Sequence, residues 1–121
     1  MKENIIKDKS FEFAVRIVNL YKYLIENKKE CILSKQLLRS GTSVGANIEE
    51  GVSGQSKKDF VSKLSISLKE AKETHYWLRL LYRCEYLDEK MFDSIIADCD
   101  EIIVILTRIL KTSRNNLEMK K

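Results

Sequence analysis

The sequence predicts an all-α protein, an up-down-up-down antiparallel four-helix bundle, and three observations support this prediction. The 121 residues include no proline and only four glycines, so the chain lacks the turn formers that β-sandwiches and barrels need. Apolar residues make up 44% and charged residues 33%, which describes a globular chain that is unusually charged. Apolar residues recur at steps of three and four in four segments, and the short connections between these segments favour antiparallel neighbours.

The first half of the chain contains two of the predicted helices. The first helix covers roughly residues 10–27 and is followed by a polar break. Its apolar face consists of Phe13, Ala14, Ile17, Val18, Tyr21, Leu24 and Ile25. The second helix covers roughly residues 33–51. Its inner face consists of Leu33, Leu37, Gly41, Val44 and Ile48. Each helix therefore presents one apolar face to a shared core.

The segment between residues 51 and 56 is the clearest boundary in the chain. Gly51 is expected to end the second helix, because glycine enters the left-handed conformation at little cost. Ser56 is expected to cap the next helix, and Asp59, three residues later, completes a pattern similar to a capping box. The third helix is predicted over residues 57–85.

A short turn around Asp88 leads to the fourth helix, which is predicted over residues 89–112. The remaining polar tail, residues 113–121, is expected to be disordered. Since no linker or repeat interrupts the chain, residues 1–121 are predicted to form a single domain.

Three stripes run along the third helix when successive residues are placed about 100° apart. The stripe that faces the bundle core consists of Phe60, Leu64, Leu68, Ala71, His75, Leu78 and Tyr82. A second apolar stripe, the outer apolar stripe, consists of Ile66, Trp77, Leu80 and Cys84. Between the two lies the basic stripe, which consists of Lys58, Lys69, Lys72, Arg79 and Arg83.

Both stripes outside the core have two interpretations. Scattered apolar residues are ordinary on a protein surface, but Trp and Leu clustered outside a core favour a subunit interface. Lys and Arg on an exposed helix face are usually just solvated. Contact with nucleic acid or an acidic partner is the alternative, because Glu70 and Glu73 lie off the basic stripe. The net charge of +4 permits such contact without requiring it.

The outer face of the second helix is formed by small and polar residues, namely Arg39, Ser43, Ala46, Asn47 and Glu50. Arg39 and Glu50 are too far apart along the helix to pair with each other. Each is therefore expected to meet a partner on another helix. We interpret this face as a polar network that fixes helix register rather than as a catalytic site.

The run from Gln36 to Gly51 closely resembles the signature of the bacterial four helix bundle protein family, also called the 23S rRNA intervening-sequence protein family. The family pattern is approximately R-S-x-x-S-[IV]-x-x-N-I-x-E-G. The residues that match it are Arg39, Ser43, Val44, Asn47, Ile48, Glu50 and Gly51. Downstream, Glu73 resembles the recurrent mid-helix glutamate of the family. The resemblance covers roughly residues 10–112.

This resemblance has implications beyond the fold. A related accessory protein of diversity-generating retroelements is a basic, homopentameric four-helix barrel that binds nucleic acid and partners a reverse transcriptase. The resemblance therefore implies a homo-oligomer, with a pentamer favoured, and a positively charged surface for RNA or DNA. It also implies a reverse transcriptase or another protein as a partner.

The sequence offers little from which an active site could be built. A di-iron bundle needs two Glu-x-x-His pairs, but the single histidine, His75, has Lys72 at that spacing. Neither G-x-x-x-x-G-K-[ST] nor G-x-G-x-x-G occurs. The cysteines, Cys31, Cys84 and Cys99, lack the spacing of a zinc site. We expect no enzymatic activity, no cofactor, no metal and no membrane span, in a cytoplasmic protein.

Two hypotheses follow. In the first, the protein is a non-enzymatic homo-oligomer that contacts RNA or DNA phosphates through the basic stripe, with Arg39 as a further contact. In the alternative, it is a protein interaction scaffold without a nucleic-acid role, and the outer apolar stripe docks a second copy or a partner protein.

Overall fold

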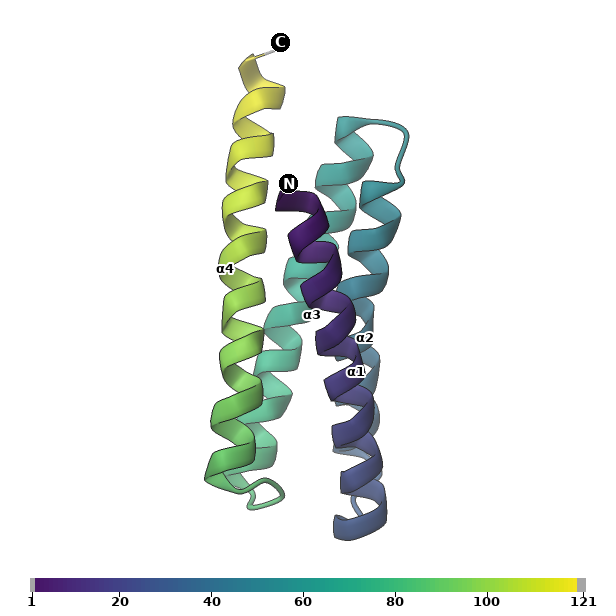
Figure 1. Cartoon of the computed structure of the whole chain (residues 1–121), viewed down its shortest axis with the longest axis vertical. Coiled ribbons are helices and arrows are strands. Elements are labelled where there is room, and N and C mark those ends of the chain that lie inside the picture. The colour runs from purple at the N-terminus through teal and green to yellow at the C-terminus, as the bar shows by residue number, and fades with distance from the viewer. Residues whose placement is uncertain (1, 120–121) are drawn as a thin grey trace.

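The computed structural model describes residues 2–119, in which the chain forms four helices. They are α1 (Lys2–Lys28), α2 (Leu33–Val52), α3 (Lys57–Arg83) and α4 (Glu89–Met119). Each helix packs against its neighbours in sequence, and α1 also packs against α4, so the helices enclose one core (Figure 1). The predicted fold class is confirmed. No helix of this part of the chain is both long enough and apolar enough to cross a membrane.

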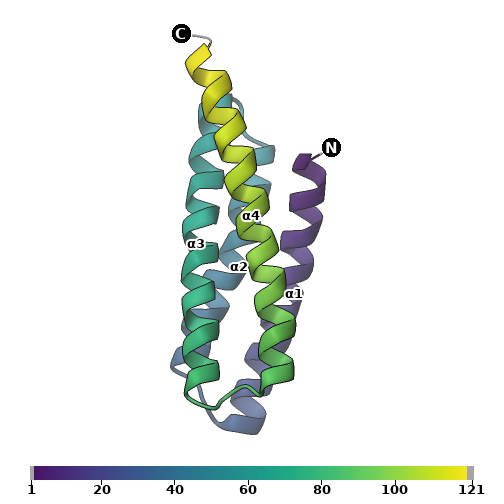
Figure 2. The same ribbon diagram turned by 90° about the vertical axis from the view of Figure 1, so that its left-hand side faces the viewer.

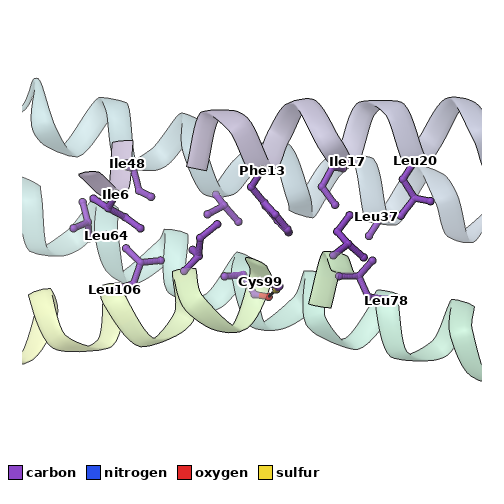
Figure 3. Close-up of a cluster of buried hydrophobic side chains, with 14 of the residues drawn as sticks. Ile6, Phe13, Ile17, Leu20, Leu37, Ile48, Leu64, Leu78, Cys99 and Leu106 are labelled. Atoms are coloured by element: carbon purple, nitrogen blue, oxygen red, sulfur yellow. Dashed lines mark hydrogen bonds between the residues drawn. The ribbon is translucent and has the colours of Figure 1, made fainter. Parts of the chain in front are cut away.

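The core runs along the centre of the bundle and takes residues from all four helices. Successive layers interdigitate from Ile6 at one end toward Leu20 at the other (Figure 3). The fully buried large side chains are Phe13, Ile6, Ile17, Leu24, Leu37, Ile48, Leu64, Leu78, Leu81, Ile102, Leu106 and Leu110. Removing this apolar surface from water is the main stabilising contribution.

Two polar side chains of α3, Ser67 and Thr74, also lie inside the bundle, although the predicted core stripe of this helix included neither. Ser67 Oγ donates a hydrogen bond of 2.7 Å to the carbonyl oxygen of Val44 on α2. Thr74 Oγ1 lies 2.9 Å from Ser40 Oγ. These bonds satisfy the buried hydroxyls and fix the register between α2 and α3.

The expected role of Gly51 as a left-handed helix stop is wrong. The helix α2 continues to Val52, and none of the four glycines has a positive φ. Gly51 is buried instead against α3, where an added Cβ would lie 2.7 Å from Leu64 Cδ1. Likewise, a Cβ at Gly41 would lie 2.8 Å from two atoms of the Ile17 side chain on α1. The glycines therefore allow α2 to approach both of its neighbours closely.

Helix ends elsewhere use other residues. The predicted Ser56 cap is confirmed, since its Oγ accepts a 3.1 Å hydrogen bond from the Asp59 amide. The left-handed positions belong to Lys29, with φ of 56°, and Glu85, with φ of 68°, which follow α1 and α3. The start of α2 is capped by Glu30, whose carboxylate accepts hydrogen bonds of 2.8 to 3.1 Å from the amides of Ile32, Leu33 and Ser34.

The first and the fourth helix are both longer than the sequence predicted. The first begins at Lys2 rather than near Ser10, because Ile6 is fully buried one heptad before Phe13. The fourth continues to Met119, and Ser113 is buried within it, where a disordered tail was expected. Figure 2 shows this end of α4 rising beyond the other helices. The last tail residues, 120–121, and Met1 lie outside the described residues.

Candidate nucleic-acid interface

The basic stripe lies on the outer face of α3. The helix α3 packs against α2 and against α4 (Figure 2). All five basic side chains are exposed, and none forms an ion pair with a carboxylate whose side chain is described. Arg83 lines a hollow with Lys28 of α1 and with Glu85, Asp88 and Glu89, so this end of the basic stripe contains charges of both signs.

The structure adds Arg114 to this surface, a residue that the sequence predicted to lie in a disordered tail. Because α4 continues past Thr112, the Arg114 guanidinium reaches across to α3 and donates a 2.9 Å hydrogen bond to Ser65 Oγ. Ser65 lies one helical turn before Lys69, in phase with the basic stripe. The absence of glycine and proline after Thr112 is the signal that could have extended the helix.

Arg79 is held in place by a chain of contacts that spans two helices. Its Nε donates to His75 Nδ1 at 3.1 Å, and His75 Nε2 lies 2.9 Å from Asp100 Oδ1 on α4. The guanidinium carbon also lies over the ring of Tyr76, 5.7 Å from its centroid. The half-buried His75 therefore sits at the edge of the core and connects Asp100 to the basic stripe.

Arg39 lies apart from the basic stripe, at the boundary between α2 and α3. Its guanidinium pairs with Glu70 at 2.9 Å and with Glu73. Two carboxylates thus offset its single charge, so the structure gives Arg39 a structural role and leaves it a weak candidate for phosphate contact. The expected inter-helix partners of Arg39 and Glu50 are present, since Glu50 lies 3.9 Å from Lys63 Nζ.

The other signature residues act within α2. Ser43 Oγ donates to the Arg39 carbonyl at 2.6 Å, and Asn47 Nδ2 donates to the Ser43 carbonyl at 2.8 Å. These two side chains therefore bond their own helix rather than a neighbour. The signature as a whole describes a packing surface, in which Arg39 pairs with α3 and Gly51 lets α3 approach.

The outer apolar stripe divides into two parts. Ile66 is 43% exposed and Cys84 is also exposed, so both are free to meet another molecule. Trp77 and Leu80 are half-buried, and Trp77 packs against the core of its own bundle. The indole N–H of Trp77 is buried without an acceptor among the described residues. Trp77 therefore contributes to the fold as well as to the surface.

The reactive side chains of the interior do not form a site. Burial raises the pKa of the Cys99 thiol to about 12, and the charges of Asp100 and Asp98 contribute to this shift. Its Sγ lies 3.4 Å from the Ala71 carbonyl oxygen, which makes it a core residue. In residues 2–119 there is no group of three His, Cys, Asp or Glu side chains arranged to hold a metal ion.

This chain is similar to a known protein family and to a solved structure. Residues 2–108 match the family model described as 23S rRNA-intervening sequence protein. A crystal structure of a protein with unknown function from the S23 ribosomal protein family of Bacteroides thetaiotaomicron VPI-5482 is 58% identical. It superposes with a TM-score of 0.90 over 92% of this chain and 99% of that chain. No curated protein matches.

Proposed function

The chain belongs to the 23S rRNA-intervening sequence protein family, and on this premise we propose that it is a non-enzymatic, homo-oligomeric, cytoplasmic protein that binds RNA or DNA. One observation carries the proposal. Five exposed cations of α3, joined by Arg114 of α4, line one face of the bundle with little neutralisation by acidic side chains. Such a face attracts phosphates and other anionic groups.

The geometry of the stripe suits a phosphate backbone. At about 1.5 Å per residue, Lys58 and Arg83 are roughly 37 Å apart along the helix axis. Contacts between flexible cations and phosphates position a nucleic acid but carry no sequence information. We therefore expect binding that is largely independent of sequence and that falls steeply with salt, because each neutralised phosphate releases counterions.

Self-association would multiply this field. Ile66 is exposed beside the basic stripe, so contacts between copies at this position would set the basic faces of neighbouring subunits side by side. A modest net charge of +4 per chain would then be repeated around a ring, for which we favour a pentamer.

A salt titration of binding tests the phosphate contacts. The triple variant Lys58→Ala, Lys69→Ala and Lys72→Ala should bind an oligonucleotide more weakly and with a salt slope shallower by about two to three, at 0.7–0.9 per contact. The matched control removes three exposed lysines between residues 22 and 35, by Lys22→Ala, Lys29→Ala and Lys35→Ala. Equal losses in both variants, or no binding by the parent at low salt, would refute the proposal.

The alternative function, a protein interaction scaffold, is favoured by the exposure of Ile66 and Cys84. A reverse transcriptase or another protein would then bind where a second copy is proposed to bind. Light scattering on the 14.1 kDa chain separates the two cases, since a monomer at micromolar concentration would leave the stripe to a different protein.

The test variant for this interface is Ile66→Glu rather than a change at Trp77, which would also disturb the core. We expect Ile66→Glu to dissociate the oligomer with the helical content unchanged. Val104→Glu is the matched control, since Val104 is 45% exposed on α4. An oligomer that persists in Ile66→Glu would show that the interface lies elsewhere.

A further inference from the structure

An aromatic residue occupies the centre of the basic stripe. Lys69, Lys72, Tyr76, Arg79 and Arg83 follow one another at steps of three and four, so Tyr76 shares the outward face with cations on both sides. Tyr76 is 49% exposed, although large aromatic side chains are usually placed where they bury their surface. Among the described residues, no hydrogen bond engages its hydroxyl.

The contacts around Tyr76 fix the orientation of its ring. The half-buried Trp77 meets it in an edge-on arrangement, with centroids 5.1 Å apart and planes at 75°. Arg79 lies over the ring and is itself held by His75, which pairs with Asp100 of α4. Since Arg79 lies over one face of the ring, a flat ligand would stack on the opposite face. Because its ring is already oriented, Tyr76 would lose little side-chain freedom when such a ligand binds.

We propose that Tyr76 is a stacking site for an unpaired base, so that the nucleic acid bound by the basic stripe is single-stranded. This inference rests on the proposed function. Bases in a duplex are stacked on one another and cannot offer a face to a side chain, whereas unpaired bases can. Proteins that bind single strands without sequence preference combine cations that follow the backbone with aromatic rings that stack on bases. Lys72 and Arg79, about 10 Å apart along the axis, flank the ring in this manner.

The experiment compares a labelled oligo(dT) and a blunt duplex of equal length by fluorescence anisotropy at low salt. We expect the parent protein to prefer the single strand. Tyr76→Leu, which keeps an apolar side chain but removes the ring, should weaken single-strand binding about tenfold and leave duplex binding unchanged. Tyr76→Phe should bind like the parent, because the ring is retained. Phe11→Ala is the matched control, since Phe11 is 57% exposed on α1, away from the basic stripe.

A photochemical readout is independent of affinity. An oligonucleotide carrying 5-iodouracil should cross-link to the parent protein at Tyr76, as mapped by mass spectrometry, because the reaction favours stacked aromatic side chains. Equal affinity of Tyr76→Leu and parent for the single strand, or a cross-link that maps elsewhere, would overturn the stacking site while the phosphate contacts stand. Failure of the parent to bind either oligonucleotide would instead refute the proposed function itself.

Discussion

At the scale of single residues, Glu30 shows how a buried carboxylate can stabilise a helix start. The residue is 8% exposed, and burial alone would raise its pKa. Hydrogen bonds from the amides of Leu33, Ser34 and Ile32 outweigh burial and hold the pKa of Glu30 below its ordinary value. Because Ile32 has no capping side chain, Glu30 supplies the negative charge that the start of α2 needs.

We predict that Glu30→Gln lowers the free energy of unfolding by about 1 kcal/mol at pH 7, the cost of losing a good cap. A pKa that is lowered by folding gives stability that is complete above the unfolded value, about 4.3, and disappears as pH falls through the folded value. Urea unfolding of both proteins at pH 7 and pH 3 measures the effect. The difference between them should shrink at pH 3, and a constant difference would contradict the prediction.

At the scale of helices, the end of α3 is less stable than it could be. Glu85 occupies the left-handed region, with φ of 68°. This conformation costs a residue that has a Cβ roughly 1–2 kcal/mol, whereas glycine adopts it freely. Its negative charge also lies at a helix C-terminus, where the helix dipole disfavours it. Both effects act on the same residue.

We therefore predict that Glu85→Gly raises the free energy of unfolding by roughly 0.5–1 kcal/mol, after the entropic cost of glycine in the unfolded chain. Thermal and urea unfolding provide the measurement. The control is Lys22→Gly, at an exposed right-handed position within α1, which should lose about 1 kcal/mol. Destabilisation by both substitutions would show that the left-handed conformation carries no strain.

At the scale of the whole molecule, the helix order and the core could be predicted because they depend on periodicity, which is local information. The packing of Gly51 against Leu64 could not be predicted, because it depends on how closely α2 and α3 approach each other. From sequence alone, Gly51 was expected only to end a helix. Polar composition after Thr112 indicated a tail, whereas the buried Ser113 holds that segment on the bundle.

The same division applies to the candidate site: features that depend on one helix could be predicted, and those that depend on helix packing could not. The basic stripe follows from the phase of α3 alone, and its five members were identified from sequence. Arg114 was missed because its place depends on the length of α4, and the pairing of Arg39 with two carboxylates depends on the register of α2 against α3. The link from Asp100 through His75 to Arg79 likewise needed the fold.

The pattern of neighbours in the bundle also determines the order in which it should assemble. Three of the helix interfaces join helices that are adjacent in sequence, and these close at low entropic cost. The α1–α4 interface joins the two ends of the chain, and ion pairs such as Arg16–Asp98, at 2.5 Å, bridge it. That interface should form after the folding transition state.

We predict that Arg16→Ala, which removes bonds to Asp98 and Ser94, accelerates unfolding and leaves the folding rate nearly unchanged in stopped-flow experiments. Val44→Ala, in the buried centre of α2, should instead slow folding. The reverse assignment would mean that the chain ends meet early. In the predicted order, the ends of the chain are the last parts to be joined and the first to separate.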